Sequence, residues 1–505
     1  MSLVKTIYRY TTLIAIIIFL ISSNLIFCQI DSFSVDEFVT FELANNSGNY
    51  TLPQNEKLQD SQEALNTLLT VNKYNPPFHF QKAWFGRGQD EHPPFYYALI
   101  HLICSIFPEQ FSFWFSYVIN LIFGSLTIFV FYRLLKQFQS SPCLSFWGTI
   151  LFAVNPGLLL ISTFLRMYMM SMFFCLLLCY LHIKFWNHTS YKYFTACIIT
   201  VICGTLTHYY FLIYAFFFYV VLCIYDMCHR HWKRFLQTVL SMSIAAIFTI
   251  AINIRIFQQL FGGDISGESV GNLWNISDYF ERILSFTKLL SQNFILGFFI
   301  LFLISILGIY KINKDKEYTW KVSLVLIPCI LFFLVATKAA IYLQYRYLSP
   351  IFPMLFLLFV LGVPSFSYTI IKKRWQSLSI AIIIILCLQS VTLYTQLTFI
   401  RNNSFAQSVA PTLSSISEYD VLCVYDAGWM NWSIYNDFAF YNSVTFCKFN
   451  NLDKIDFSTY NEDTLIVYFQ NNNSITINDL LSYFPQYNDY TLILSRGYYN
   501  VLELS

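Results

Sequence analysis

Two adjacent carboxylates, Asp36 and Glu37, follow directly on the first long apolar stretch of the chain. A membrane protein gains no stability from carboxylates placed at its water boundary, so this pair predicts a catalytic site that faces one compartment. A carboxylate there can deprotonate the hydroxyl of an acceptor. Asp90 and Glu91 form a second pair, which fits substrate binding and the complementing of a helix dipole equally well.

Cationic side chains lie near the ends of several later apolar stretches, at Arg166, His208, Lys338 and Arg346. Arginine and lysine hold phosphate groups through charge-assisted hydrogen bonds. Cations beside carboxylates therefore suit a phosphorylated lipid whose phosphate leaves when an acceptor hydroxyl attacks the anomeric carbon of a sugar. Lys338 fits a snorkelling anchor at a span end as well as it fits a phosphate contact.

The composition of the chain indicates that these side chains belong to a membrane protein. Hydrophobic residues make up 56% of the 505 residues, aromatic residues 20% and charged residues only 11%. Ordinary soluble domains carry about 25% charged residues, so we predict a polytopic α-helical membrane protein. The net charge of +2 gives no reason to expect nucleic acid as a partner.

About eleven apolar runs reach spanning length. The first, Leu13–Cys28, is preceded by Lys5 and Arg9 and has no small-x-small cleavage site, so we interpret it as a retained span. The other ten runs are 112–132, 143–163, 167–185, 193–208, 210–227, 236–256, 292–310, 322–338, 348–367 and 376–398.

Basic residues between these runs predict the orientation. The richest loops are 133–136, 230–234, 311–321 and 372–374, and the positive-inside rule assigns all four to the cytoplasm. Eleven spans satisfy this rule when the N-terminus is cytoplasmic. Residues 31–92 then form a large external first loop, and 93–108, too short to cross the bilayer, form an interfacial helix opened by Pro93 and Pro94.

After residue 398 the composition becomes rich in Asn, Asp, Tyr and Ser, and short strand-like runs alternate with helical candidates. We therefore predict a small α/β domain at 399–505, on the external side by span parity. Of the thirteen cysteines, Cys423 and Cys447 lie in this tail, where an oxidising compartment permits a disulfide without requiring one.

Taken in order, several short motifs resemble glycosyltransferase family 39, which contains the protein O-mannosyltransferases and the bacterial aminoarabinose transferases. The resemblance covers roughly residues 10–400, so that 1–398 is the expected catalytic domain with the membrane fold called GT-C. Its motifs are Asp36-Glu37, His92-Pro93-Pro94-Phe95-Tyr96-Tyr97, Arg166 with Tyr168, Thr207-His208-Tyr209-Tyr210, and Tyr345-Arg346-Tyr347 followed by Pro350 and Pro353.

The resemblance implies a transferase that uses a polyprenyl-phosphate-linked sugar on the external face of a membrane, most simply the bacterial inner membrane. It makes Asp36 the expected base and gives Glu37 the task of organising the acceptor or the sugar. The implied contacts to the donor phosphate are Arg166, Lys338 and Arg346. Further substrate contacts are expected from Asp90, Glu91, His92, Tyr168, His208 and Tyr345.

Two other classes remain open at this stage. A transporter or lipid flippase also has many spans with a few embedded charges, although paired halves and broken helices are not evident. An inactive membrane scaffold is the third class. The residues identify neither the sugar nor whether the acceptor is a protein, a lipid or a glycan. Adjacent carboxylates could hold a divalent cation, but no full set of metal ligands is apparent.

Overall fold

The computed structural model describes residues 8–85, 92–187, 190–262, 264–274, 277–312, 316–455, 460, 464–470, 476–487 and 489–505. The chain divides into two compact units. The first, here called the helical unit, comprises Met1–Cys28, Arg87–Tyr96 and Trp114–Thr398. The second, called the sheet unit, comprises Gln29–Gly86, Tyr97–Phe113 and Phe399–Ser505.

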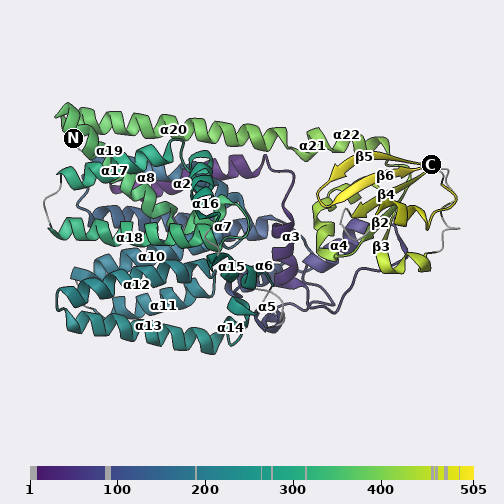
Figure 1. Ribbon diagram of the computed structural model, residues 1–505, viewed down its shortest axis with the longest axis horizontal. Helices are drawn as coiled ribbons and strands as arrows, with labels where there is room; N and C mark the ends of the chain where they lie inside the picture. Colours follow the sequence, from purple (N-terminus) through teal and green to yellow (C-terminus); the bar gives the residue numbers. More distant parts are fainter. Residues whose placement is uncertain are drawn as a thin grey trace. The chain divides into compact units, whose positions relative to one another are not determined.

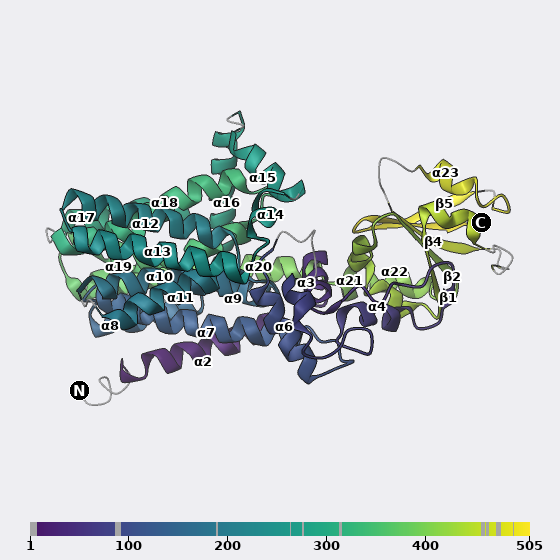
Figure 2. The ribbon, with the colours of Figure 1, turned by 90° about the horizontal axis from the view of Figure 1, so that it is seen from below.

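Each of the eleven apolar runs falls on a helix or on a pair of helices. The helices of the helical unit are α2 (Thr11–Phe27), α7 (Trp114–Gln137), α8 (Pro142–Ala153), α9 (Pro156–Thr163), α10 (Tyr168–Asn187), α11 (Tyr191–Thr205), α12 (Tyr210–Cys228), α13 (Trp232–Ile252), α14 (Ile256–Phe261), α15 (Asp264–Trp274), α16 (Tyr279–Asn293), α17 (Phe298–Ile312), α18 (Lys316–Ala339), η1 (Tyr345–Ile351), α19 (Phe352–Ile371) and α20 (Arg374–Asn402). Helices α10 to α13 lie side by side (Figure 1). In Figure 2, α14 and α15 are seen at one end of this unit.

These helices make the protein a multi-pass membrane protein. Among the described residues, six helices are long and apolar enough to cross a bilayer, and two bent pairs raise the number to eight. Four shorter apolar helices, of 10 to 17 residues, accompany them. The count of eleven spans remains a prediction, because length and composition alone do not settle which of the shorter helices cross.

Two of the predicted spans are broken by identifiable residues. Helices α8 and α9 meet at 43°, where Pro156 begins α9 and the Asn155 side chain accepts a hydrogen bond from the backbone N–H of Leu158 at 3.2 Å. Helices α16 and α17 meet at 91° near Gly297, whose φ is +71°. Helix α16 was not predicted, because its polar and charged residues do not form an apolar run.

Close helix packing in the helical unit depends on small residues. A Cβ atom added to Gly308 of α17 would collide with the backbone oxygen of Gly362 in α19. A Cβ on Gly362 would likewise collide with the backbone of Ser305. Small residues at such a crossing let two helix backbones approach closely, which increases their van der Waals contact inside a membrane.

The sheet unit contains six strands in the order β1-β3-β2-β4-β6-β5. The strands are β1 (Lys57–Leu58), β2 (Asp420–Tyr425), β3 (Val444–Lys448), β4 (Leu465–Gln470), β5 (Tyr490–Arg496) and β6 (Tyr499–Leu504). Strand β2 runs parallel to both β3 and β4, whereas the other pairs are antiparallel. Because β1 comes from residues of the predicted first loop, that loop extends the sheet built by the C-terminal residues.

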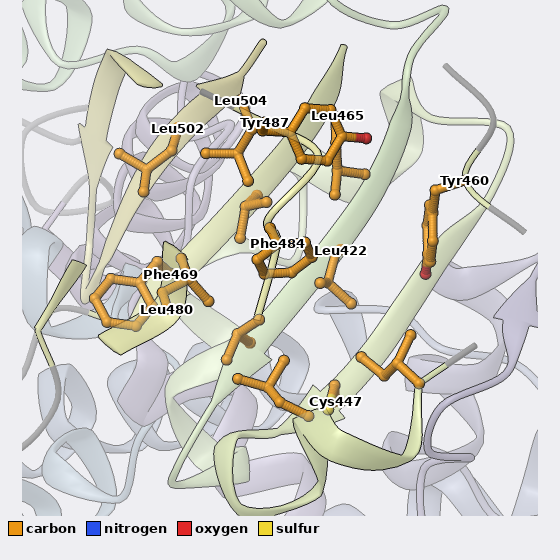
Figure 3. Packing of buried hydrophobic residues seen from close by; sticks show 14 residues of the cluster. Leu422, Cys447, Tyr460, Leu465, Phe469, Leu480, Phe484, Tyr487, Leu502 and Leu504 are labelled. Atoms are coloured by element: carbon orange, nitrogen blue, oxygen red, sulfur yellow. The ribbon is translucent and has the colours of Figure 1, made fainter. Parts of the chain in front are cut away.

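One face of the sheet carries the main apolar core of this unit, where Leu422, Phe469 and Leu502 pack against Leu480 and Phe484 (Figure 3). Cys447 belongs to this core and pairs in register with Val424. Cys423, one residue earlier on β2, projects to the opposite face of the sheet, because side chains alternate along a strand. The two cysteines are both free thiols, and their placement does not allow a disulfide between them.

Residues 29–86 and 97–113 contribute further contacts inside the sheet unit. The elements are α3 (Val35–Asn45), α4 (Ser61–Leu69), α5 (Phe80–Phe85) and, from Tyr97 onward, α6 (Phe95–Ile106). The Asp31 carboxylate accepts hydrogen bonds from the backbone N–H groups of Phe405 and Ala406, each at 3.0 Å. The indole N–H of Trp432 donates to Glu42 at 3.0 Å. Segments more than 300 residues apart therefore form one compact body.

A buried carboxylate in the sheet unit predicts a pH-dependent stability. Asp437 is fully buried, and burial raises its pKa from 3.8 to about 6, although Arg496 and the Tyr468 hydroxyl both bind it. The folded state therefore holds this proton more tightly than the unfolded state. The associated stability is complete below pH 3.8 and is lost as the pH rises through about 6.

Replacing Asp437 by Asn removes this titration. Between pH 3.5 and pH 7 the unfolding free energy of the wild type should therefore fall by roughly 3 kcal/mol relative to the Asp437→Asn variant. Thermal unfolding of the purified proteins in detergent at several pH values measures the difference. Glu418→Gln, at an exposed carboxylate of the same unit, serves as the control. A gap between wild type and Asp437→Asn that does not change with pH would contradict the titration.

Candidate active site

Four segments of the helical unit bring cationic and aromatic side chains together. These are the residues before α6, the α9–α10 connection, the α11–α12 connection, and η1. The rings of His92 and His208 lie 6.2 Å apart, and those of Tyr168 and His208 lie 5.2 Å apart. Tyr347 approaches Tyr168 to 6.2 Å and Tyr210 to 5.4 Å. Of the sequence-predicted residues, the structure thus gathers His92, Tyr168, His208 and, as shown below, Arg166 and Arg346.

Arg166 is held in a tight turn directly after α9. Its backbone N–H donates to the Phe164 carbonyl at 2.8 Å, and the Asn120 side-chain amide donates to the same carbonyl at 2.7 Å. The hydroxyl of Tyr96 donates in turn to Asn120 at 3.0 Å. Tyr96, which belongs to the His-Pro-Pro motif, is fully buried and supports the turn that carries Arg166.

Arg166 and His92 contact each other directly. Arg166 is 4% exposed, and its Nη2 donates to Nε2 of His92 at 3.2 Å. The backbone oxygen of His92 accepts a hydrogen bond from Gln259 at 3.1 Å, and Gln259 in turn accepts from the Tyr209 hydroxyl at 2.6 Å. This network holds the start of the His-Pro-Pro motif against Tyr209, which precedes α12, and Gln259 of α14.

His208 has a defined protonation state. Its Nδ1 accepts the backbone N–H of Tyr210 at 3.0 Å, so the ring proton lies on Nε2. Burial of the ring, together with the nearby positive charges of Arg166 and Arg346, holds the pKa of His208 well below its usual range. His208 is therefore a neutral imidazole that can donate one hydrogen bond through Nε2.

Arg346 lies among aromatic rings. Its guanidinium carbon is 4.7 Å from the ring centre of Phe164 and 5.7 Å from those of Tyr168 and Tyr347. Aromatic faces attract a planar guanidinium and orient it. Tyr345, predicted as a substrate contact, begins η1 and is half-buried; Tyr347, two residues later, makes the ring contacts with Tyr168 and Tyr210.

Lys338 occupies the last turn of α18 and forms an ion pair with Asp278, the residue before α16. Arg282 of α16 donates from Nε to the Thr337 carbonyl at 2.9 Å, and its charge also reaches the Tyr210 hydroxyl. Asp278 and Arg282 were not predicted from the sequence. A polar segment without a recognisable motif offers no signal that it returns to the end of another helix.

Asp36 and Glu37 lie in the first turn of α3, within the sheet unit. Glu37 is 5% exposed, and its Oε2 accepts hydrogen bonds from the backbone N–H and the hydroxyl of Ser34 at 2.8 and 3.0 Å. This is the carboxylate half of a capping box, so Glu37 satisfies the start of its own helix. Asp36, beside it, is half-buried. Asp90 and Glu91 lie outside the described residues.

The described residues contain no group of three or more His, Cys, Asp or Glu side chains that could hold a metal ion. The side chains that the helical unit brings together are suited to binding an anion. Two buried or half-buried guanidinium groups and a neutral imidazole donor converge within a tyrosine-lined site. Charge-assisted hydrogen bonds from such groups suit a phosphate.

The chain is similar to known proteins in sequence and in fold. Residues 91–254 match the family described as dolichyl-phosphate-mannose-protein mannosyltransferase. ArnT from Cupriavidus metallidurans bound to undecaprenyl phosphate is 11% identical, with a TM-score of 0.53 over 96% of this chain and 97% of that one. Its apo form is 10% identical, with a TM-score of 0.50 over 92% and 96%.

No curated protein sequence matches the chain significantly. The identities to the solved structures are low, so they establish the fold, whereas the family match rests on the sequence of the segment that carries His92, Arg166 and His208. The resemblance that the motifs indicated is thereby confirmed: the chain has the GT-C fold, and residues 91–254 match the model of the dolichyl-phosphate-mannose-protein mannosyltransferase family.

Proposed function

We propose that this protein is a glycosyltransferase that moves a sugar from a polyprenyl-phosphate-linked donor to a protein, lipid or glycan acceptor on the extracytoplasmic face of a membrane. The observation that carries the proposal is the convergence of Arg166, His208 and Arg346 around the tyrosines of the helical unit. Cations buried at the end of an apolar helix bundle are costly, and an anionic ligand repays that cost.

The chemistry of a lipid-phosphate donor matches these groups. The acceptor oxygen forms a bond to the anomeric carbon while the bond between that carbon and the phosphate oxygen breaks, and the polyprenyl phosphate leaves with the bonding electrons. Negative charge grows on the phosphate during this step. Arg166 and Arg346 stabilise that charge, and Nε2 of His208 donates a hydrogen bond to the same group.

Similarity to ArnT supports the lipid part of this proposal. That protein was crystallised with undecaprenyl phosphate, and its fold covers nearly the whole of this chain. An apolar helix bundle with exposed hydrophobic side chains provides a surface along which a polyprenyl chain lies in the membrane while its phosphate reaches the cations. As part of the proposal, we assign the protein to the bacterial inner membrane.

The general base is assigned to Asp36. It takes the proton of the acceptor hydroxyl as that oxygen bonds to the sugar. The motif resemblance supports this role for Asp36, and the hydrogen bonds that Glu37 accepts from Ser34 in the capping box support a different role for Glu37. Glu37 is accordingly assigned to holding the first turn of α3, which carries Asp36.

The assignment predicts different results at the two adjacent positions. Asp36→Asn should lower sugar transfer from a polyprenyl-phosphate donor at least about 1,000-fold, since an amide cannot accept the proton. Glu37→Gln should retain most activity, because glutamine also completes a capping box. Radiolabelled or mass-detected transfer by purified protein measures both. Glu63→Gln on α4 is the exposed-carboxylate control. Full activity of Asp36→Asn would remove that residue from the mechanism.

Variants of Arg346 test whether the planar guanidinium group contributes to donor binding in addition to its positive charge. Arg346→Lys keeps the positive charge but loses the guanidinium plane that packs on Phe164 and Tyr168, so kcat/KM for the donor should fall about 10- to 100-fold. Arg346→Ala should fall further. Steady-state kinetics with a polyprenyl-phosphate-linked sugar provide the numbers, with Arg374→Lys at an exposed arginine as the control. Equal activity of Arg346→Lys and wild type would exclude a bidentate phosphate contact.

The proposed orientation is tested separately from the chemistry. The positive-inside rule places Lys316 in the cytoplasm and Glu418 outside. Cysteines introduced at these exposed positions should react with a membrane-impermeant maleimide in intact cells only at position 418, and at both positions after permeabilisation. Unmodified protein corrects for labelling of native cysteines. Labelling of both positions in intact cells would overturn the proposed topology.

A further inference from the structure

The start of α16 is fastened across the end of α18. The Tyr279 hydroxyl donates to the Leu334 carbonyl at 2.9 Å, and Arg282 donates to the carbonyls of Thr337 and Ala340. Carbonyls in the last turn of a helix lack partners within the helix, so the bond from Arg282 to Thr337 satisfies a group that α18 leaves open. The bonds from Tyr279 and Arg282 also fix the beginning of the connection from α18 to η1, which carries Arg346.

Within this junction the ion pair between Asp278 and Lys338 is asymmetric. The Lys338 side chain is 7% exposed, whereas the Asp278 side chain is 41% exposed. An ammonium group with so little access to water needs an anionic partner at all times. A carboxylate with this much exposure is well solvated when it leaves. Asp278 is therefore the exchangeable member of the pair and Lys338 the fixed one.

We propose that Asp278 occupies Lys338 in the absence of donor and is replaced there by the donor phosphate, so that Asp278 sets the affinity of the site for polyprenyl phosphates. The inference rests on the proposed function, because it takes Lys338 as a phosphate contact. Asp278 is a positioning residue that acts through Lys338, and it takes no part in bond making. Its release leaves α16 in place, since Tyr279 and Arg282 hold that helix through backbone carbonyls of α18.

The ion pair gives this poorly exposed lysine a counter-charge before its ligand arrives. The exchange also predicts the direction in which mutation of Asp278 changes donor affinity. An ion pair with only a structural role would not change the affinity in that direction. Removing a merely structural partner weakens a site, whereas removing a competing one strengthens binding. Asp278 therefore gives a gain of affinity on mutation, at a residue whose loss leaves the chemical step intact.

Asp278→Asn tests this direction. It should tighten binding of undecaprenyl phosphate to the purified full-length protein about fivefold and lower the donor KM to a similar extent, with little change in kcat. Asp278→Glu, which keeps the charge, should behave as wild type. Glu281→Gln, an exposed carboxylate of α16, is the matched control. In a Lys338→Met background, Asp278→Asn should have no effect on binding.

Binding and transfer are measured separately, so failure of the inference differs from failure of the proposed function. Tighter binding by Asp278→Asn without sugar transfer by any variant supports the exchange and counts against the transferase. Transfer by the wild type with unchanged or weaker binding by Asp278→Asn overturns the exchange. Should Asp278→Asn fail to fold, Asp278→Ser is equally neutral and caps a helix start, and the same two outcomes apply.

Discussion

Positive charge held at the end of an apolar helix bundle is the constraint on which the helical unit depends. A guanidinium or ammonium group in such a place needs a ring face, a counter-charge or a ligand. Each cation of the site has a distinct solution. Arg166 contacts His92, Arg346 packs on Phe164 and tyrosine rings, and Lys338 pairs with Asp278.

Backbone groups at helix ends supply the rest of the framework. The Asn120 amide donates to the Phe164 carbonyl after α9, and Arg282 donates to the Thr337 carbonyl in the last turn of α18 and to the Ala340 carbonyl just after it. The open carbonyls of two helix ends are thus satisfied by side chains from other helices, and the connections that carry Arg166 and Arg346 become defined in position. Breaks in helices serve the same purpose, since the bends at Pro156 and near Gly297 redirect the chain at the connections rather than weaken the bundle.

The sheet unit shows how residues distant in sequence can share one body. Strand β1 joins β3, Asp31 binds the backbone at Phe405 and Ala406, and Trp432 binds Glu42. Helix α3, which carries Asp36, is therefore supported by the C-terminal residues. This gives the C-terminal segment a function that its own composition does not reveal: it stabilises the part of the first loop in which the proposed base lies.

Apolar length located most helices of the helical unit from the sequence alone, because spanning segments are continuous and local, and the eleven runs all fall on helices or helix pairs. The motif residues Arg166, Tyr168, His208 and Arg346 were likewise found by type and by their place after or before a run. Tertiary structure decided the interactions that require two segments distant in sequence to meet. It assigned Glu37 to a cap and separated Cys423 from Cys447 across the sheet. It also brought Asp278 and Arg282 to the end of α18, a relation without any local signal, because α16 is polar and its partner carbonyls belong to the backbone of another helix.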